Sequence, residues 1–214
     1  MKKITKNLLF TVLGLFMAAS AYAQIEITPQ AGYQVGSKYS YYDGYMKLKA
    51  SGHFGVTVDF DINPIGAQIE VFYAFQDADF NIKDYFVFPY ETFITKVNVH
   101  HIQAGFIQNF NYDEPLRPFA GISAGVSVFN PQYVEHGGAG YGYDPASRTK
   151  FSFGFTGGVK YFFTERIGLR MQAQLLIPLE WGGVYYTGGG GAITTGGSLL
   201  QLNFTGGLIF RLGD

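Results

Sequence analysis

The sequence contains no cysteine, few charged residues and, after residue 23, no long apolar run. The lack of cysteine excludes disulfide bonds and thiolate chemistry, so the fold gains nothing from covalent cross-links. Charged residues amount to 14% of the chain, compared with about 25% in typical soluble domains. The basic residues form no patch or arm, which argues against a nucleic-acid partner. A membrane-spanning helix needs about 20 consecutive apolar residues, so helical spans are excluded after residue 23.

The first 23 residues have the three-part organisation of a secretory signal peptide. A basic head with three lysines precedes an apolar middle at 8–19 and the cleavage site Ala21-Tyr22-Ala23. We therefore expect residues 1–23 to be removed and residues 24–214 to form one domain. Loss of the three lysines leaves 12 basic residues (15 − 3) against 16 acidic ones, a net charge near −4. The alternative, a retained anchor helix, would need a longer apolar stretch.

Long alternation of apolar and polar residues is the dominant pattern of the remaining chain. In the last stretch, 198–212, Leu202 and Phe204 lie on one face and Asn203 and Thr205 on the other. At roughly 3.3 Å per residue this strand would be about 50 Å long, which suits a tilted crossing of a bilayer. Seven further segments alternate in the same way: 25–35, 45–60, 65–76, 92–110, 118–129, 150–163 and 167–181.

Two of these segments give predictions about individual side chains. In 45–60 the even-numbered residues, including Leu48, form the apolar face. In 92–110 the apolar face includes Val97 and Val99 and then changes phase. A one-residue β-bulge near His100 and His101 would absorb that change and point both imidazoles inward.

The connections between the eight segments alternate in length. Short ones (61–64, 111–117 and 164–166) alternate with long ones (36–44, 77–91, 130–149 and 182–197). This alternation is typical of transmembrane barrels, which have short periplasmic turns and longer outer loops. We therefore predict an all-β fold, an eight-stranded antiparallel up-and-down transmembrane β-barrel with both termini in the periplasm. A soluble barrel of the lipocalin kind would place its apolar faces inside.

The A-x-A signal, the eight strands, the alternating connections and the terminal Leu208–Leu212 segment resemble small outer-membrane barrels of the OmpA-domain and OmpX kind. The resemblance is architectural and covers the whole mature chain. It implies residence in the outer membrane of a Gram-negative bacterium, insertion by the outer-membrane assembly machinery, and contact with outer-membrane lipid and lipopolysaccharide. The end of the chain differs slightly, because such proteins commonly finish on an aromatic residue whereas Phe210 is followed by four more residues.

Six charged residues fall on the polar faces in the periplasmic half of the predicted barrel. They are Glu26, Asp59, Glu70, Lys160, Arg170 and Arg211. We expect Glu70 to face Arg170 across the lumen and Glu26 to neighbour Arg211, because buried charges need partners. A lumen of eight strands is only wide enough for its own side chains, so a structural plug is the favoured interpretation. The alternative is a gate or selectivity element in a narrow pore for ions or small solutes.

The sequence offers little support for a catalytic, metal or cofactor site. His53, His100 and His101 could ligate a metal, but no cysteine or carboxylate is spaced to complete the site. Ser51 and His53 share one face about 7 Å apart, without an orienting acid or oxyanion donors. We therefore expect no metal, no cofactor and no enzymatic activity. The alternative is an outer-membrane lipid-modifying hydrolase.

The long connections are rich in tyrosine and glycine. Some of the aromatic residues would form the interfacial girdle of a barrel. Others could bind a surface protein or a glycan, because tyrosine supplies contact area at low entropic cost. The candidates for this surface are Tyr41, Tyr42, Tyr85, Tyr141, Tyr143, Tyr185 and Tyr186.

Overall fold

The structure is a computed structural model that describes most of the chain beyond the predicted signal peptide. The described residues are 24–41, 44–62, 65–84, 93–132, 147–179, 184–186, 192–194 and 200–213. The predicted signal peptide, 1–23, lies outside them. The described residues include no helix that is both long and apolar enough to cross a membrane.

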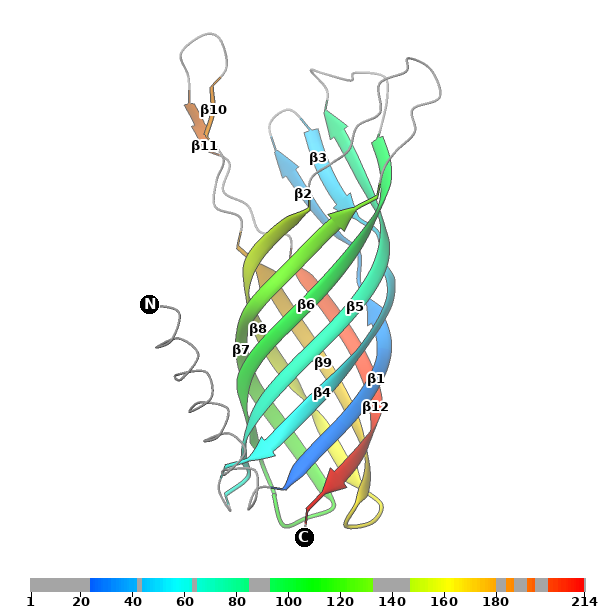
Figure 1. Ribbon diagram of the computed structural model, residues 1–214, viewed down its shortest axis with the longest axis vertical. Helices are drawn as coiled ribbons and strands as arrows, with labels where there is room; N and C mark the ends of the chain where they lie inside the picture. Colours follow the sequence, from blue (N-terminus) through cyan, green and yellow to red (C-terminus); the bar gives the residue numbers. More distant parts are fainter. Residues whose placement is uncertain are drawn as a thin grey trace, which may run out of the picture.

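Strands make up nearly all of the described structure (Figure 1). They are β1 (Ile25–Gln34), β2 (Ser37–Tyr41), β3 (Gly44–Leu48), β4 (Ser51–Asp61), β5 (Ala67–Asp84), β6 (Phe93–Asn109), β7 (Leu116–Pro131), β8 (Arg148–Phe162), β9 (Ile167–Pro178), β10 (Val184–Tyr186), β11 (Ala192–Thr194) and β12 (Gln201–Leu212). Eight of them form the barrel wall, in the order β1, β4, β5, β6, β7, β8, β9 and β12, and each pairs antiparallel with the next. The wall closes because β1 pairs with both β4 and β12. The predicted eight-stranded antiparallel barrel is confirmed.

The two faces of the wall strands separate as the alternation predicts. Phe155 and Phe204 point outward and are 53% and 51% exposed, whereas Asn203 and Gln174 are buried inside. Asn203 and Gln174 lie side by side on β12 and β9. A soluble barrel would have the opposite polarity, so this arrangement supports an apolar belt around a polar lumen.

The strand register corrects two of the side-chain predictions. No bulge occurs at His100 and His101, because β6 keeps one constant register with β5 and with β7. Val97, Val99 and His101 therefore face the lumen, and His100 faces outward. A bulge lies instead between β3 and β4, where five steps from Leu48 to His53 match four steps on β5. It turns Leu48 into the lumen, where the side chain is 1% exposed.

The long connections contain hairpins that the sequence did not predict. The β2–β3 hairpin pairs with the upper part of β5, so a small sheet of β2, β3, β5 and β6 extends beyond the barrel ring (Figure 1). The β10–β11 hairpin projects at the same end. The short connections and the beginning of β1 lie at the opposite end of the barrel, together with the end of β12.

Inward-facing glycines allow neighbouring strands of this narrow barrel to lie close together. A Cβ atom added to Gly105 would lie 2.3 Å from the carbonyl oxygen of Ile122 on the adjacent strand. At the outward-facing Gly157, an added Cβ would meet nothing nearer than 3.9 Å. Glycine is therefore a steric requirement inside the barrel, and the lumen is filled by the larger side chains that remain.

Candidate functional site

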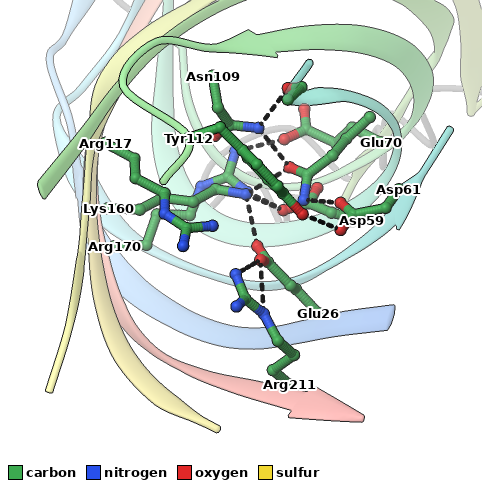
Figure 2. Close-up of polar contacts among 12 residues, drawn as sticks. Glu26, Asp59, Asp61, Glu70, Asn109, Tyr112, Arg117, Lys160, Arg170 and Arg211 are labelled. Atoms are coloured by element: carbon green, nitrogen blue, oxygen red, sulfur yellow. Dashed lines mark hydrogen bonds and ion pairs between the residues drawn. The ribbon is translucent and has the colours of Figure 1, made fainter. Parts of the chain in front are cut away.

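Five buried charges and one partly buried arginine, Arg211, meet in one half of the lumen, near the short connections (Figure 2). They are the six predicted from the sequence: Glu26 from β1, Asp59 from β4, Glu70 from β5, Lys160 from β8, Arg170 from β9 and Arg211 from β12. We call them the charge cluster. Three cations face three anions, so the cluster as a whole is neutral. Alternation places each of these side chains inside, because each sits in phase with the polar face of its strand.

Lys160 is the centre of the charge cluster. Its ammonium donates hydrogen bonds to Glu26 Oε2 at 2.7 Å, to Asp59 Oδ2 at 2.8 Å and to the amide oxygen of Gln68 at 2.7 Å. An ammonium has three donors, so all of them are used. Lys160 and both carboxylates are at most 1% exposed. These bonds tie β8 to β1, β4 and β5 across the lumen.

The two arginines complete the pairing. Arg170 donates to Asp59 Oδ2 at 2.8 Å and to Glu70, and its Nε donates to the amide oxygen of Gln172 at 2.6 Å. Arg211 donates to Glu26 Oε1 at 2.6 Å. The contacts between Glu70 and Arg170 and between Glu26 and Arg211 are those expected from the sequence. Charge-assisted hydrogen bonds of this kind offset the cost of removing charges from water only when the partners are well placed.

Aromatic rings stack on the cations of this region. Phe119 lies under the Arg170 guanidinium, 4.5 Å from its ring centroid. Near the end of the barrel, Arg117 lies between Tyr112 and Phe162, at 4.5 Å and 4.6 Å from their ring centroids. On β12, Arg211 lies 4.1 Å from the centroid of Phe162. Cation–π contacts therefore extend the charge cluster into a layer that crosses the end of the lumen.

Tyr112 belongs to the short connection between β6 and β7 and reaches across this end of the barrel. Its hydroxyl donates a hydrogen bond to Asp61 Oδ2, the carboxylate at the end of β4 (Figure 2). Burial raises the pKa of Tyr112 to about 12, and the hydrogen bond to Asp61 and its charge act in the same direction. The same Asp61 accepts a hydrogen bond from Gln68, which links the turn to the charge cluster.

The other half of the lumen contains two buried histidines, His53 and His101, surrounded by polar side chains and by a buried apolar cluster that includes Phe72 and Leu176. The ring centroids of His53 and His101 lie 6.3 Å apart, and the rings are nearly parallel. His101 is hydrogen-bonded to Ser127 at 2.8 Å. Among the described residues, neither Ser51 Oγ nor either ring nitrogen of His53 has a hydrogen-bond partner. In the described part of the chain, no three His, Cys, Asp or Glu residues are grouped as a metal site would require.

Comparison with known proteins agrees with this geometry. The sequence profile of the outer membrane protein beta-barrel domain matches residues 8–178. The chain belongs to this outer membrane barrel family. Membership places it among proteins of the Gram-negative outer membrane. No curated protein sequence matches the chain.

Three solved structures illustrate the similarity of fold. OprG of Pseudomonas aeruginosa superposes with a TM-score of 0.57 at 8% identity, covering 90% of this chain and 97% of its own. Neisserial surface protein A superposes with a TM-score of 0.55 at 17% identity, covering 88% and 97%. Ail, the attachment invasion locus protein of Yersinia pestis, gives 0.51 at 13% identity and covers 89% and 99%. Its structure contains the heparin analogue sucrose octasulfate. At these identities the similarity concerns the fold.

Sequence reasoning did not identify several residues that complete the charge cluster of this outer membrane barrel. Gln68 and Phe119 face the lumen, and the alternation of their strands could have placed them beside the charged residues. Tyr112 gave no such signal, because it lies in a turn and a turn has no periodic pattern. Arg117 was assigned to the same turn, but it is the second residue of β7 and lies opposite Lys160. His100, expected inside, lies outside and is hydrogen-bonded to the hydroxyl of Tyr73 at 3.0 Å.

The predicted tyrosine surface is largely outside the described residues. The backbone of Tyr41 lies in β2, and that of Tyr185 and Tyr186 in β10, all at the end of the barrel that carries the long connections. The remaining candidates, Tyr42, Tyr85, Tyr141 and Tyr143, lie outside the described residues.

Proposed function

We propose that this outer membrane protein is a closed barrel that acts structurally or through its outer loops. In this proposal the charge cluster is a plug that ties the walls together and blocks the lumen. The short connections and both termini lie in the periplasm, and the tyrosine-rich connections face the cell exterior. Envelope integrity, adhesion and binding of a surface protein or glycan are the roles that such a molecule could perform.

The observation that carries this proposal is the position of Lys160. Its ammonium bonds to groups on three other strands, so the side chain extends across the lumen instead of along the wall. Arg170 extends beside it and is 0% exposed. A conducting path for hydrated ions would need both side chains to leave carboxylates that hold them by charge-assisted hydrogen bonds. The arrangement therefore favours a plug over a narrow pore.

The hydrolase alternative has less support in the site geometry. A serine nucleophile needs its base within hydrogen-bond reach and needs donors for the oxyanion. Ser51 and His53 are two residues apart on one strand face, and their polar atoms make no hydrogen bond to each other. Both side chains lie inside the barrel wall, away from the lipid on which such an enzyme would act.

Planar-bilayer recording tests the plug directly. Refolded protein is inserted into the bilayer, with a wide porin as the positive control for insertion. We expect no steady single-channel conductance from the wild-type protein. Steady openings of uniform size in the wild type would contradict the plug and support the narrow pore.

A deletion strain tests the role of the loops. The strain is complemented either with the wild-type gene or with a variant in which the seven candidate tyrosines are replaced by serine. We expect both genes to restore resistance to detergent, because the barrel itself is unchanged. Only the wild-type gene should restore adhesion to surfaces coated with protein or glycan. Equal adhesion by both strains would remove the tyrosines from the proposal.

A further inference from the structure

Three exposed lysines lie on the outward face of the small sheet that extends beyond the barrel ring. Lys38 on β2 is directly opposite Lys47 on β3, so the two side chains leave the same face of the hairpin. Lys96 on β6 is directly opposite Asp79 on β5. We call Lys38, Lys47 and Lys96 the lysine face.

The neighbours of these lysines establish which way they point. Leu48, next to Lys47, is 1% exposed, and Val97, next to Lys96, is 3% exposed. Side chains alternate along a strand, so the buried neighbours face the lumen and the lysines face outward. The one-residue bulge after β3 brings Lys47 to this outward face. A strand without the bulge would have placed Lys47 inside.

The height of the lysine face matches the edge of the apolar belt. On β5, Val71 and Tyr73 point outward and are about 40% exposed. Asp79, opposite Lys96, follows Tyr73 by six residues on the same outward face. With a rise of about 3.3 Å per residue and a tilt of about 45°, this step is about 14 Å along the membrane normal. Lys96 therefore lies about 14 Å beyond Tyr73, and Lys47, opposite Asn81, lies two residues further along β5. We infer that the lysine face is at the level of the lipid headgroups, on the side of the sheet that faces lipid.

Charges of the described residues balance the lysine face only in part. Asp79 is already paired with Lys49 at 3.0 Å, and Asp77 is the other carboxylate of β5 on this face. The Lys38 ammonium lies 4.4 Å from the ring centroid of Tyr45. Lys47 and Lys96 form no ion pair with any described residue. Like charges directly opposite each other in a sheet are destabilising unless an anion is shared between them.

We propose that the lysine face binds the phosphate groups of the lipid leaflet that surrounds this end of the barrel. Lysine is a compact cation that binds phosphate as a point charge. A lipid is favoured over a soluble anion because the lysines lie at headgroup depth beside the exposed apolar belt. The proposal rests on the orientation given above, which makes this leaflet the outer one and lipopolysaccharide its phosphate-bearing lipid.

A binding measurement tests the lysine face with the complete barrel in detergent micelles. The ligands are lipopolysaccharide, the same lipopolysaccharide after removal of its phosphates, and inorganic phosphate as a free competitor. The variants are Lys47→Gln alone and the triple variant Lys38→Gln/Lys47→Gln/Lys96→Gln. Arg148→Gln is the control for loss of an exposed charge, because Arg148 lies on the face of β8 that carries the buried Ser152 and not on the lysine face. Comparable mobility of unheated samples on gels verifies that every variant folds.

Each lysine near a charged membrane surface contributes about a fivefold change in affinity. We expect Lys47→Gln to weaken lipopolysaccharide binding about fivefold and the triple variant at least tenfold. Arg148→Gln and the wild type should bind equally, and dephosphorylated lipopolysaccharide should bind both wild type and triple variant weakly. Equal binding by wild type and triple variant would overturn the proposal. Full competition by inorganic phosphate would assign the lysines to a free anion and overturn the lipid assignment.

Cell labelling separates this proposal from the orientation on which it rests. The chain has no cysteine, so Lys38→Cys introduces a single thiol. A membrane-impermeant maleimide should label it on intact cells. Failure to label intact cells, with labelling after lysis, would reject the orientation while leaving the micelle measurement of phosphate binding as it stands.

Discussion

Replacing Lys160 by methionine should destabilise the barrel far more than the same replacement of an exposed lysine. The substitution removes three buried hydrogen bonds at 2.7 Å to 2.8 Å and leaves the charge cluster with three anions and two cations. Glu26 keeps Arg211 and Asp59 keeps Arg170, so neither carboxylate becomes isolated. Breaking a buried ion pair costs about 3–5 kcal/mol. Because both carboxylates keep a partner, we expect Lys160→Met to cost about 3 kcal/mol.

The chain contains a matched control for this substitution. Lys49 pairs with Asp79 at 3.0 Å, but the two side chains are 44% and 41% exposed. Exposed pairs contribute about 0–1 kcal/mol, so Lys49→Met should change the free energy of unfolding by no more than that. The assay is urea unfolding of protein refolded into lipid vesicles, monitored by far-ultraviolet circular dichroism.

A charge-balanced double variant tests the cause of the loss. Lys160→Met/Asp59→Asn removes one cation and one anion, and retains the Arg170–Glu70 and Arg211–Glu26 pairs. We expect the double variant to recover at least about 1 kcal/mol relative to Lys160→Met, since no unbalanced charge stays buried. The reasoning is refuted if Lys160→Met and Lys49→Met cost the same, or if the double variant is less stable than Lys160→Met.

Two further predictions concern the end of the lumen and the wall. The pKa of Tyr112 is raised from 10.0 to about 12, so its stabilising contribution should be present below pH 10 and lost as the pH rises through 12. Tyr112→Phe should therefore cost about 1 kcal/mol or less at neutral pH, because the ring is half-exposed, and this difference should vanish in unfolding titrations above pH 12. Gly105→Ala should lower the unfolding free energy by more than about 1 kcal/mol, because its Cβ would overlap the next strand, whereas Gly157→Ala should be neutral or stabilising in the same urea assay. Equal effects of the two alanines would contradict the steric account of the inward glycines.

Period-two alternation predicted the barrel because one face of each strand had to meet lipid and the other had to meet a crowded lumen. The same argument placed the six charges inside and paired Glu70 with Arg170. It failed where a lumen residue is apolar: Val97, Val99 and Leu48 are inside although their chemistry suits lipid. In 92–110, the apolar Val97 and Val99 were assigned to the lipid face, so the alternation was interpreted as changing phase and a bulge was predicted.

The bulge between β3 and β4 could not be predicted from the sequence. Lys47, Leu48 and Lys49 alternate without interruption, and only pairing with β5 shows that one extra residue lies between β3 and β4. The layer formed by Tyr112, Arg117 and Phe162 depends on a turn folding back across the barrel end. Such a contact joins residues without a shared periodicity, so alternation contains no information about it.

Fluorescence quenching by lipids with brominated acyl chains tests most directly which face of the wall meets lipid. The chain has one tryptophan, Trp181, so a Trp181→Phe background allows a single probe to be placed elsewhere. Val71 is 40% exposed, and the adjacent Phe72 on the same strand is 1% exposed. We predict strong quenching of Val71→Trp and little quenching of Phe72→Trp. Stronger quenching of Phe72→Trp than of Val71→Trp would contradict a barrel whose apolar side chains face lipid and whose polar lumen is closed.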